Sequence, residues 1–152
     1  MIVVSRTPLR ISYFGGGTDY PEYFRRARGA VLGMAIDKYV YVAALRLTNT
    51  LDFRYRVSYS RLETVNDAAE IQHPVVRSVL QRYGVRDPLA ISVLTDLPAR
   101  SGLGSSSSFT VGCINLVSSL QQRTITKLDL AREAVYVAVS YTHLTLPTIC
   151  SV

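Results

Sequence analysis

The chain has 152 residues, enough for one domain with a sizeable core, and its 48% hydrophobic and 18% charged residues exclude a disordered protein. The formal net charge is +6, and arginine supplies every basic residue except Lys38 and Lys127, so a phosphorylated ligand or a nucleic acid is a conceivable partner. No apolar run approaches the roughly 20 residues of a membrane-spanning helix, and the N-terminus lacks the layout of a signal peptide, so we expect a cytoplasmic protein with no membrane contact.

The N-terminal residues are predicted to form extended structure that is interrupted at a proline. Residues 2–5 and 9–14 are two short extended pieces, and Pro8 lies between them without the N–H group that a sheet ladder needs. We therefore expect a break in the strand, or an edge position, at this point. A loop of three glycines follows at 15–17, and then one or two helical turns within 21–28.

Residues 33–47 and 53–60 are each predicted to form a strand. The first stretch is rich in Val, Ile and Tyr, which favour strands, and the second alternates apolar and polar residues in the pattern of a half-buried strand. A turn signal lies between them at 49–52. We therefore expect residues 33–60 to form an antiparallel hairpin.

A helix and a further strand are predicted next along the chain. Pro74 suits the first position of a helix, the apolar residues after it share one helical face, and Gly84 ends the segment. Residues 89–95 are predicted to form the strand that follows.

Two more helices complete the predicted elements. Apolar residues recur at helical spacing over 109–120, and another helix should begin at Thr126, where Asp129 completes a capping pair. Strands and helices mix without strict alternation. We therefore expect an α+β fold, a two-layer mixed sheet with helices on one face.

The segment "LPARSGLGSSSSF", between the last predicted strand and the helix after it, combines glycines and serines. A glycine-rich turn that leads into a helix brings several backbone N–H groups and the positive end of the helix dipole to one point, which favours a bound phosphate. Serine hydroxyls add neutral donors or ligate a metal ion. The alternative is purely structural, a serine that caps the helix after a flexible turn.

Two motifs together resemble those of the GHMP kinases, the small-molecule kinases that include galactokinase, homoserine kinase and mevalonate kinase. "LPARSGLGSSSS" is similar to the phosphate-binding motif of the family, with Pro98 and Gly102–Ser107 at the matching positions. "PLRISYFGGGTDYP" is similar to the first motif of the family, with Arg10, Asp19 and Tyr20 at the matching positions. The resemblance implies the fold of a GHMP kinase N-terminal domain, which is similar to domain 2 of ribosomal protein S5.

The resemblance also implies a site for ATP and Mg²⁺. Ser106 matches a magnesium ligand, and Arg10 matches a catalytic arginine that assists the attacking hydroxyl or neutralises charge on the transferred phosphate. The expected nucleotide-binding residues are Pro98, Ser101, Gly102, Leu103, Gly104, Ser105, Ser106, Ser107 and Ser108. The expected substrate-binding residues are Gly16, Gly17, Thr18, Asp19 and Tyr20.

The three glycines at 15–17 indicate which branch of the family the chain most resembles. Galactokinase-like members carry Gly-Glu-His at this place, and "FGGGTDYPEYF" with "EIQHPVVR" most resembles the branch of heptose 7-phosphate kinases. A site without that carboxylate and imidazole is wider and less negative, which fits a substrate that already bears a phosphate. We therefore expect Gly16→Glu or Gly17→Glu to weaken phosphosugar binding.

The last residues, "SYTHLTLPTICSV", interrupt the helical pattern after Val139 and contain Pro147. We expect residues 1–139 to be an incomplete N-terminal, ATP-binding domain and residues 140–152 to be a non-native tail; the alternative is a genuine terminal strand. The catalytic aspartate of the family, the acidic residue that helps to hold magnesium and the C-terminal domain would lie downstream. We therefore expect a fragment of a sugar or sugar-phosphate kinase that is inactive by itself.

A second hypothesis is a standalone nucleotide- or RNA-binding module of the same fold without catalysis. Arginines clustered on one exposed sheet face would favour RNA. The arginines are scattered along the sequence except at Arg25, Arg26 and Arg28, so we expect solvated charges, a small-molecule sugar partner and no nucleic acid. Cys113 and Cys150 show no metal-ligand or redox spacing, and no disulfide is expected.

Overall fold

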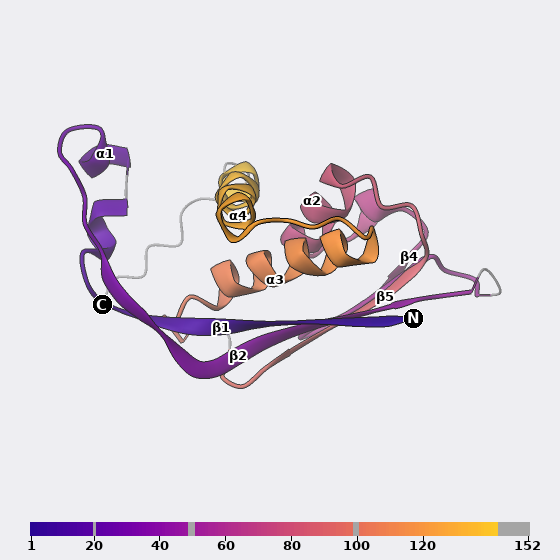
Figure 1. The fold of residues 1–152 in the computed structure, drawn as a ribbon. Coiled ribbons are helices and arrows are strands. Elements are labelled where there is room, and N and C mark those ends of the chain that lie inside the picture. Colours follow the sequence, from indigo (N-terminus) through magenta and orange to yellow (C-terminus); the bar gives the residue numbers. More distant parts are fainter. Residues whose placement is uncertain (20, 49–50, 99–100, 143–152) are drawn as a thin grey trace.

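Helices cover one face of a five-stranded mixed sheet in the computed structural model, which describes residues 1–19, 21–48, 51–98 and 101–142 (Figure 1). The strand order is β1-β2-β5-β3-β4, with β3 and β5 parallel and the other neighbours antiparallel. The predicted α+β, two-layer fold is confirmed. The strands are β1 (Ile2–Phe14), β2 (Leu32–Arg46), β3 (Tyr55–Ser58), β4 (Leu62–Val65) and β5 (Leu89–Thr95). The helices are α1 (Pro21–Phe24), α2 (Pro74–Arg82), α3 (Ser105–Leu120) and α4 (Lys127–Thr142), with 3₁₀ segments η1 (Gly16–Asp19) and η2 (Ala68–Glu70).

β1 is one long strand at the edge of the sheet, and the predicted break into two pieces is wrong. Pro8 pairs with Tyr39 of β2, and the register shifts between Pro8 and Arg10. The chain accommodates the proline at an edge strand with a bulge, where a missing N–H group disturbs only one ladder. The predicted edge position is therefore correct.

The predicted antiparallel hairpin at 33–60 is also wrong. β2 pairs with β1 and β5, while β3 pairs with β4 and, in parallel, with β5. β5 therefore lies between the two strands that we expected to be neighbours. Its first three residues, 89–91, are buried, and Leu89 and Ile91 belong to the hydrophobic core.

The helices begin and end close to the predicted positions. Pro74 is at the start of α2, and Gly84, with φ of 60°, follows its end. Thr126 Oγ1 accepts from the Asp129 N–H at 3.2 Å and donates to the Asp129 carboxylate at 2.7 Å, so the predicted capping pair is present. α4 continues to Thr142, and the rest of the predicted tail lies outside the described residues. None of the helices within the described ranges has the length and apolar character that crossing a membrane requires.

α3 approaches the sheet most closely at Gly112. A Cβ atom at this position would lie 3.0 Å from Thr7 Oγ1 and 3.4 Å from Val42 Cγ2. The neighbouring turns of α3 bury Cys113, Leu116 and Val117 against the same core. This close contact fixes α3, and with it the start of the helix, over β1 and β2.

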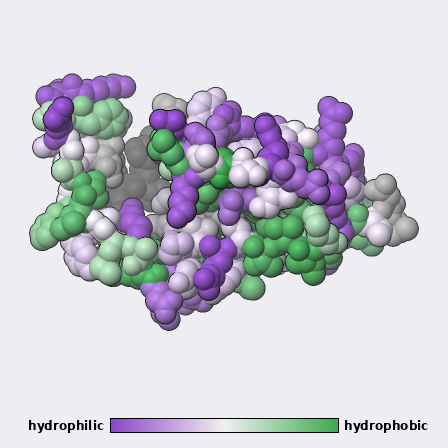
Figure 2. Space-filling view, in the orientation of Figure 1, coloured by the Kyte–Doolittle hydropathy of each residue, from purple (hydrophilic) through white to green (hydrophobic). Residues whose placement is uncertain are grey.

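The sheet face opposite the helices is open, and Figure 2 shows an apolar patch below α3, towards the N-terminal end of β1. Exposed apolar side chains that the strand register places there are Ile2, Val4, Leu45 and Leu94. Among the described strand residues of this face the arginines are Arg6 on β1 and Arg56 on β3, and β2 and β5 lie between these two strands. The arginine cluster that would favour RNA binding is therefore not formed on the described part of this face.

Candidate functional site

The loop between β5 and α3 turns on two glycines in the left-handed backbone region. Gly102 has φ of 75° and Gly104 has φ of 73°, a conformation that residues with a Cβ atom rarely adopt. Asp96 fixes the start of the loop, because its carboxylate accepts from Tyr39 N at 2.8 Å and its own N–H donates to Tyr39 O at 3.0 Å. The loop therefore leaves the sheet from an anchored point.

Gly104 is the N-cap residue of α3 and leaves the start of the helix without a side-chain cap. Its carbonyl accepts the first helical hydrogen bond from Ser108 N at 3.0 Å. Because glycine has no side-chain oxygen, it cannot cap the N–H groups of the first turn, which lie at the positive end of the helix dipole. Such a helix start is suited to an anion. The alternative of a serine cap is not found, since the helix begins at Ser105 after a glycine.

Arg10 brings the first motif to this loop. Its N–H donates to Leu103 O at 3.1 Å. Its side chain passes over Gly104, where a Cβ atom would lie 3.1 Å from the Cγ and Nε atoms of Arg10. Glycine is thus favoured at position 104 both by the positive φ and by the arginine above it. A permanent positive charge beside a helix N-terminus suits a polyanion such as a triphosphate.

The serines of the loop have different environments. Ser108 is buried, and its hydroxyl donates to Pro8 O at 2.8 Å, which ties α3 to β1. Ser107 is exposed and its hydroxyl donates back to Gly104 O at 3.1 Å, and Ser106 is also exposed. The predicted nucleotide-binding residues Pro98 and Ser101 are exposed on either side of residues 99–100, which lie outside the described ranges. The loop therefore exposes Ser101, Ser106 and Ser107, half-buries Ser105 and uses Ser108 as a structural anchor.

The glycine loop of the first motif lies on an arm formed by the far ends of β1 and β2. Gly15 has φ of 90°, and the N–H and Oγ1 of Thr18 both donate to its carbonyl, at 2.9 and 2.7 Å. A Cβ atom at Gly16 or Gly17, by contrast, would meet no atom within 4 Å. Gly16→Glu and Gly17→Glu therefore test charge at this place rather than packing.

The structure separates Arg10 from the rest of the first motif. Arg10 lies within β1, whereas Gly15 follows its last residue, and an extended strand advances about 3.3 Å per residue, so Gly15 lies roughly 16 Å farther along the strand. Asp19 ends η1, but its side chain and the whole of Tyr20 lie outside what the structure describes. Arg10 thus meets the serine loop, while the described part of the predicted substrate loop is farther out on the arm (Figure 1).

Sequence reasoning missed a cluster of aromatic rings behind the first turn of α3. The His73 ring lies 4.8 Å from the Tyr59 ring and 4.9 Å from the Phe109 ring, measured between centroids. Burial lowers the pKa of His73, and the nearby carboxylate of Glu63 partly opposes this effect. His73 directly precedes Pro74 in the sequence, and no local pattern indicates that Phe109 would meet it. The cluster packs α2 and the β3–β4 turn against the helix that carries the loop.

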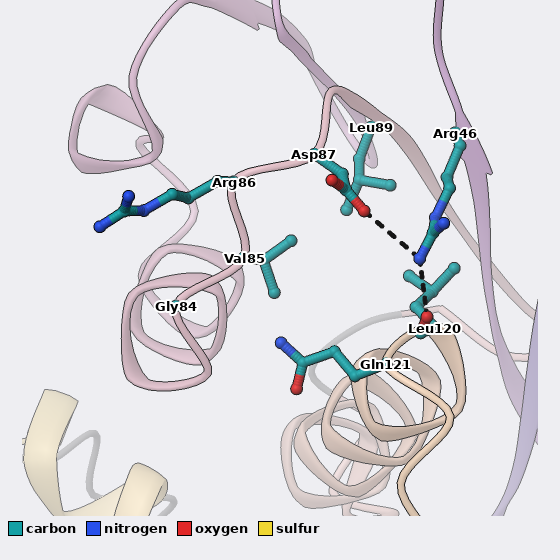
Figure 3. Close-up of a pocket in the computed structure, with 8 residues that line it drawn as sticks. All are labelled: Arg46, Gly84, Val85, Arg86, Asp87, Leu89, Leu120 and Gln121. Atoms are coloured by element: carbon teal, nitrogen blue, oxygen red, sulfur yellow. Dashed lines mark hydrogen bonds and ion pairs between the residues drawn. The ribbon is translucent and has the colours of Figure 1, made fainter.

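A pocket of about 210 Å³ lies at the opposite end of α3 (Figure 3). Arg46 donates there to Leu120 O at 2.8 Å and forms an ion pair with Asp87 at 3.3 Å. None of the predicted site residues lines this pocket. The Arg46 guanidinium thus binds the C-terminal end of α3 and the Asp87 carboxylate. This end of the molecule is distinct from the candidate site.

The donors around Gly104 fit a triphosphate better than they fit a metal ion alone. The described residues contain no group of three or more His, Cys, Asp or Glu side chains that could hold a metal. A magnesium ion at this place would depend on phosphate oxygens and water, with a serine hydroxyl as a further ligand. The described part of the site therefore suits magnesium that arrives with its nucleotide.

Residues 63–145 match the family model described as the GHMP kinases N terminal domain. Among curated proteins, the chain is 28% identical over 142 residues to a D-glycero-alpha-D-manno-heptose 7-phosphate kinase of Campylobacter jejuni, an alignment that covers 86% of this chain and 41% of that protein. It is also 28% identical over 136 residues to a galactokinase of Thermotoga petrophila, covering 85% of this chain and 37% of that protein. The chain spans about two fifths of the length of these relatives.

Solved structures share the fold. A D-glycero-D-manno-heptose 1-phosphate kinase from B. thetaiotaomicron superimposes with a TM-score of 0.76 at 21% sequence identity. The superposition covers 90% of this chain and 47% of the other. At this level of identity the likeness concerns the arrangement of strands and helices.

Proposed function

This chain belongs to the GHMP kinase family, as an N-terminal domain, and we propose that it forms the ATP-binding part of an enzyme that phosphorylates a hydroxyl of a sugar or sugar phosphate. The observation that carries the proposal is the contact between Arg10 and Gly104. It joins the two motifs of the sequence at the uncapped start of α3, where a chain of phosphates would meet both backbone N–H groups and a guanidinium.

Each group of the site has a proposed role. The N–H groups of the first turn of α3 hold the triphosphate, and Ser106 contributes to the magnesium site. Arg10 neutralises charge on the phosphoryl group while a substrate hydroxyl attacks it. Phosphoryl transfer depends mainly on positioning and on charge stabilisation, so few side chains are needed. Gly16, Gly17, Thr18, Asp19 and Tyr20 form the substrate loop.

The substrate proposed is a sugar phosphate of the heptose 7-phosphate kind. Support comes from the kinase of Campylobacter jejuni, whose name specifies this substrate, and from the open space at Gly16 and Gly17. We place the enzyme in the cytoplasm, where ATP is available. Because the acidic catalytic group is expected downstream of the matched region, we propose that the 152-residue chain binds ATP without turning it over.

The proposal predicts that Mg-ATP protects the chain against unfolding. A ligand at 100 times its Kd stabilises the folded state by about 2.7 kcal/mol. We expect a corresponding rise in the unfolding midpoint, measured by thermal denaturation at increasing Mg-ATP. Ser106→Ala and Arg10→Ala should reduce this rise.

Ser119→Ala is the matched control, because Ser119 is an exposed serine near the other end of the same helix. It should leave the effect of Mg-ATP unchanged. Absence of protection in the unsubstituted chain would contradict the nucleotide site. Release of ADP in the presence of a heptose phosphate would contradict the proposed lack of turnover.

A further inference from the structure

The arm at the end of the sheet where α3 begins contributes nothing to the hydrophobic core (Figure 1). From Tyr13 to Ala35, none of the side chains whose burial the structure describes is buried. Its turn after α1 carries Arg25, Arg26 and Arg28, all of them exposed. Hydrophilic side chains accordingly cover the tip of the arm (Figure 2). The three arginines are therefore exposed on a part of the fold where no described side chain is buried.

These three arginines also have no ion-pair partner among the described side chains. The ion pairs of the described residues involve Arg46, Arg82 and Arg132, which lie on β2, α2 and α4. On the described part of the arm, Glu22 is the only acidic side chain. Among the side chains that the structure describes, the tip of the arm is thus a concentration of positive charge without an ion-pair partner.

The fold attaches this basic turn to the predicted substrate loop. Thr18 Oγ1 donates to Ala30 O at 3.3 Å as well as to Gly15 O. A Cβ atom at Gly29 would lie 2.7 Å from Thr18 Oγ1, so the two segments touch. Arg28 is the residue before this contact, and it therefore borders the glycine loop.

We propose that Arg25, Arg26 and Arg28 bind the phosphate group of a sugar-phosphate substrate and select it over the unphosphorylated sugar. A guanidinium matches phosphate geometry with two parallel hydrogen bonds, and three within four residues provide several such donors. The adjoining loop presents three glycines, which add no negative charge near the phosphate. The inference rests on the proposed function, since it names the substrate class of the same enzyme.

The acceptor end and the phosphate end of such a substrate need different anchors. The hydroxyl that is phosphorylated must approach Arg10 and the serine loop, where the triphosphate is proposed to bind. The phosphate already present on the sugar carries like charge and must be held away from that triphosphate. The basic turn after α1 lies out on the arm (Figure 1), whereas Arg10 lies at the serine loop, so the two groups are placed apart as this requires.

The test compares binding of D-glycero-D-manno-heptose 7-phosphate and of the unphosphorylated heptose to the complete 152-residue chain by calorimetry. Three triple variants are used: Arg25, Arg26 and Arg28 changed to Ala, the same three changed to Lys, and Arg56, Arg86 and Arg123 changed to Ala as a control. The control positions are exposed and lie elsewhere, and their replacement removes the same charge. Circular dichroism would show that each variant is folded.

We expect the unsubstituted chain to prefer the phosphosugar, and the alanine variant to lose about tenfold or more of its affinity for it. Affinity for the heptose should stay the same, and the lysine variant should recover only part of the loss. An equal loss in the control variant would overturn the inference, because binding would then follow net charge. No preference for the phosphosugar, or no effect of the alanine changes, would overturn it as well.

Protection by Mg-ATP, measured on the same samples, separates this inference from the proposed function. If Mg-ATP protects every variant while phosphosugar binding is insensitive to the arm, the arginine site is wrong and the nucleotide site stands. If Mg-ATP protects none of them, the proposed kinase function fails independently of the arm.

Discussion

Gly104 illustrates how one residue without a side chain can organise a site. Its left-handed backbone turns the chain into α3, its lack of a hydroxyl leaves the first turn uncapped, and its lack of a Cβ atom admits the Arg10 side chain. A side chain at this position would oppose the backbone conformation and displace the guanidinium at the same time. The phosphate binding proposed for the loop thus depends on the lack of a side chain at Gly104 as much as on the neighbouring serines.

His73 provides a prediction at the same scale. Burial lowers its pKa in the folded chain, so between the ordinary histidine value of about 6.5 and the folded value the unfolded chain binds more protons. The folded state should therefore lose stability as the pH falls below about 6.5. We expect urea denaturation at pH 7.5 and 5.5 to show this loss, and His73→Phe, which keeps the ring between Tyr59 and Phe109, to make it smaller. His143 is present in both proteins, and an equal loss in both would rule out His73 as the cause.

At the scale of elements, the position of α3 decides where the loop points. The helix is held to β1 at two places, by the hydroxyl of Ser108 on Pro8 O and by the close packing of Gly112 on Thr7. The residues of α3 at both contacts, Ser108 and Gly112, are small, and this allows the helix axis to come close to the strands. The start of α3 and Arg10 are thereby kept in one fixed arrangement.

Gly112→Val should disrupt this contact. Its Cβ atom would lie 3.0 Å from Thr7 Oγ1 before the two methyl groups are added, and overpacking of this kind costs about 1–3 kcal/mol. Asn115→Val introduces the same side chain at an exposed position of α3 and should change stability by less than about 0.5 kcal/mol, because valine and asparagine have nearly equal helix propensities. The free energy of unfolding in urea measures both changes. No loss in Gly112→Val, or an equal loss in the two variants, would contradict a cost that arises from contact with the sheet.

At the scale of the whole molecule, the sheet is covered on one face and open on the other. The helices bury one face, and Val4 and Leu94 on the other are 59% and 67% exposed. Exposed apolar side chains of neighbouring strands form a surface that favours association. The isolated chain therefore exposes apolar side chains to water on the face of the sheet opposite the helices.

Val4→Thr combined with Leu94→Thr should reduce self-association of the isolated chain at high concentration, measured by sedimentation velocity. Stability should change by no more than about 0.5 kcal/mol, because neither side chain is in the core. Leu128→Gln with Val135→Gln, two exposed apolar positions of α4, is the control and should leave association unchanged. A chain that stays monomeric at all concentrations would contradict this prediction.

The sequence by itself determined the local features of this protein. Pro74, Gly84 and the Thr126–Asp129 pair mark helix ends because they act within one turn, and the two motifs indicated the GHMP kinase family and its fold. The tertiary structure alone decided which strands are neighbours, since β5 enters between β2 and β3, and which distant residues meet, as Arg10 and Gly104 do. Turn signals and alternation describe a segment and its two faces, whereas the choice of partner depends on burying the first half of β5, residues 89–91, in the core. That choice is a property of the whole core, and no stretch of the sequence contains it.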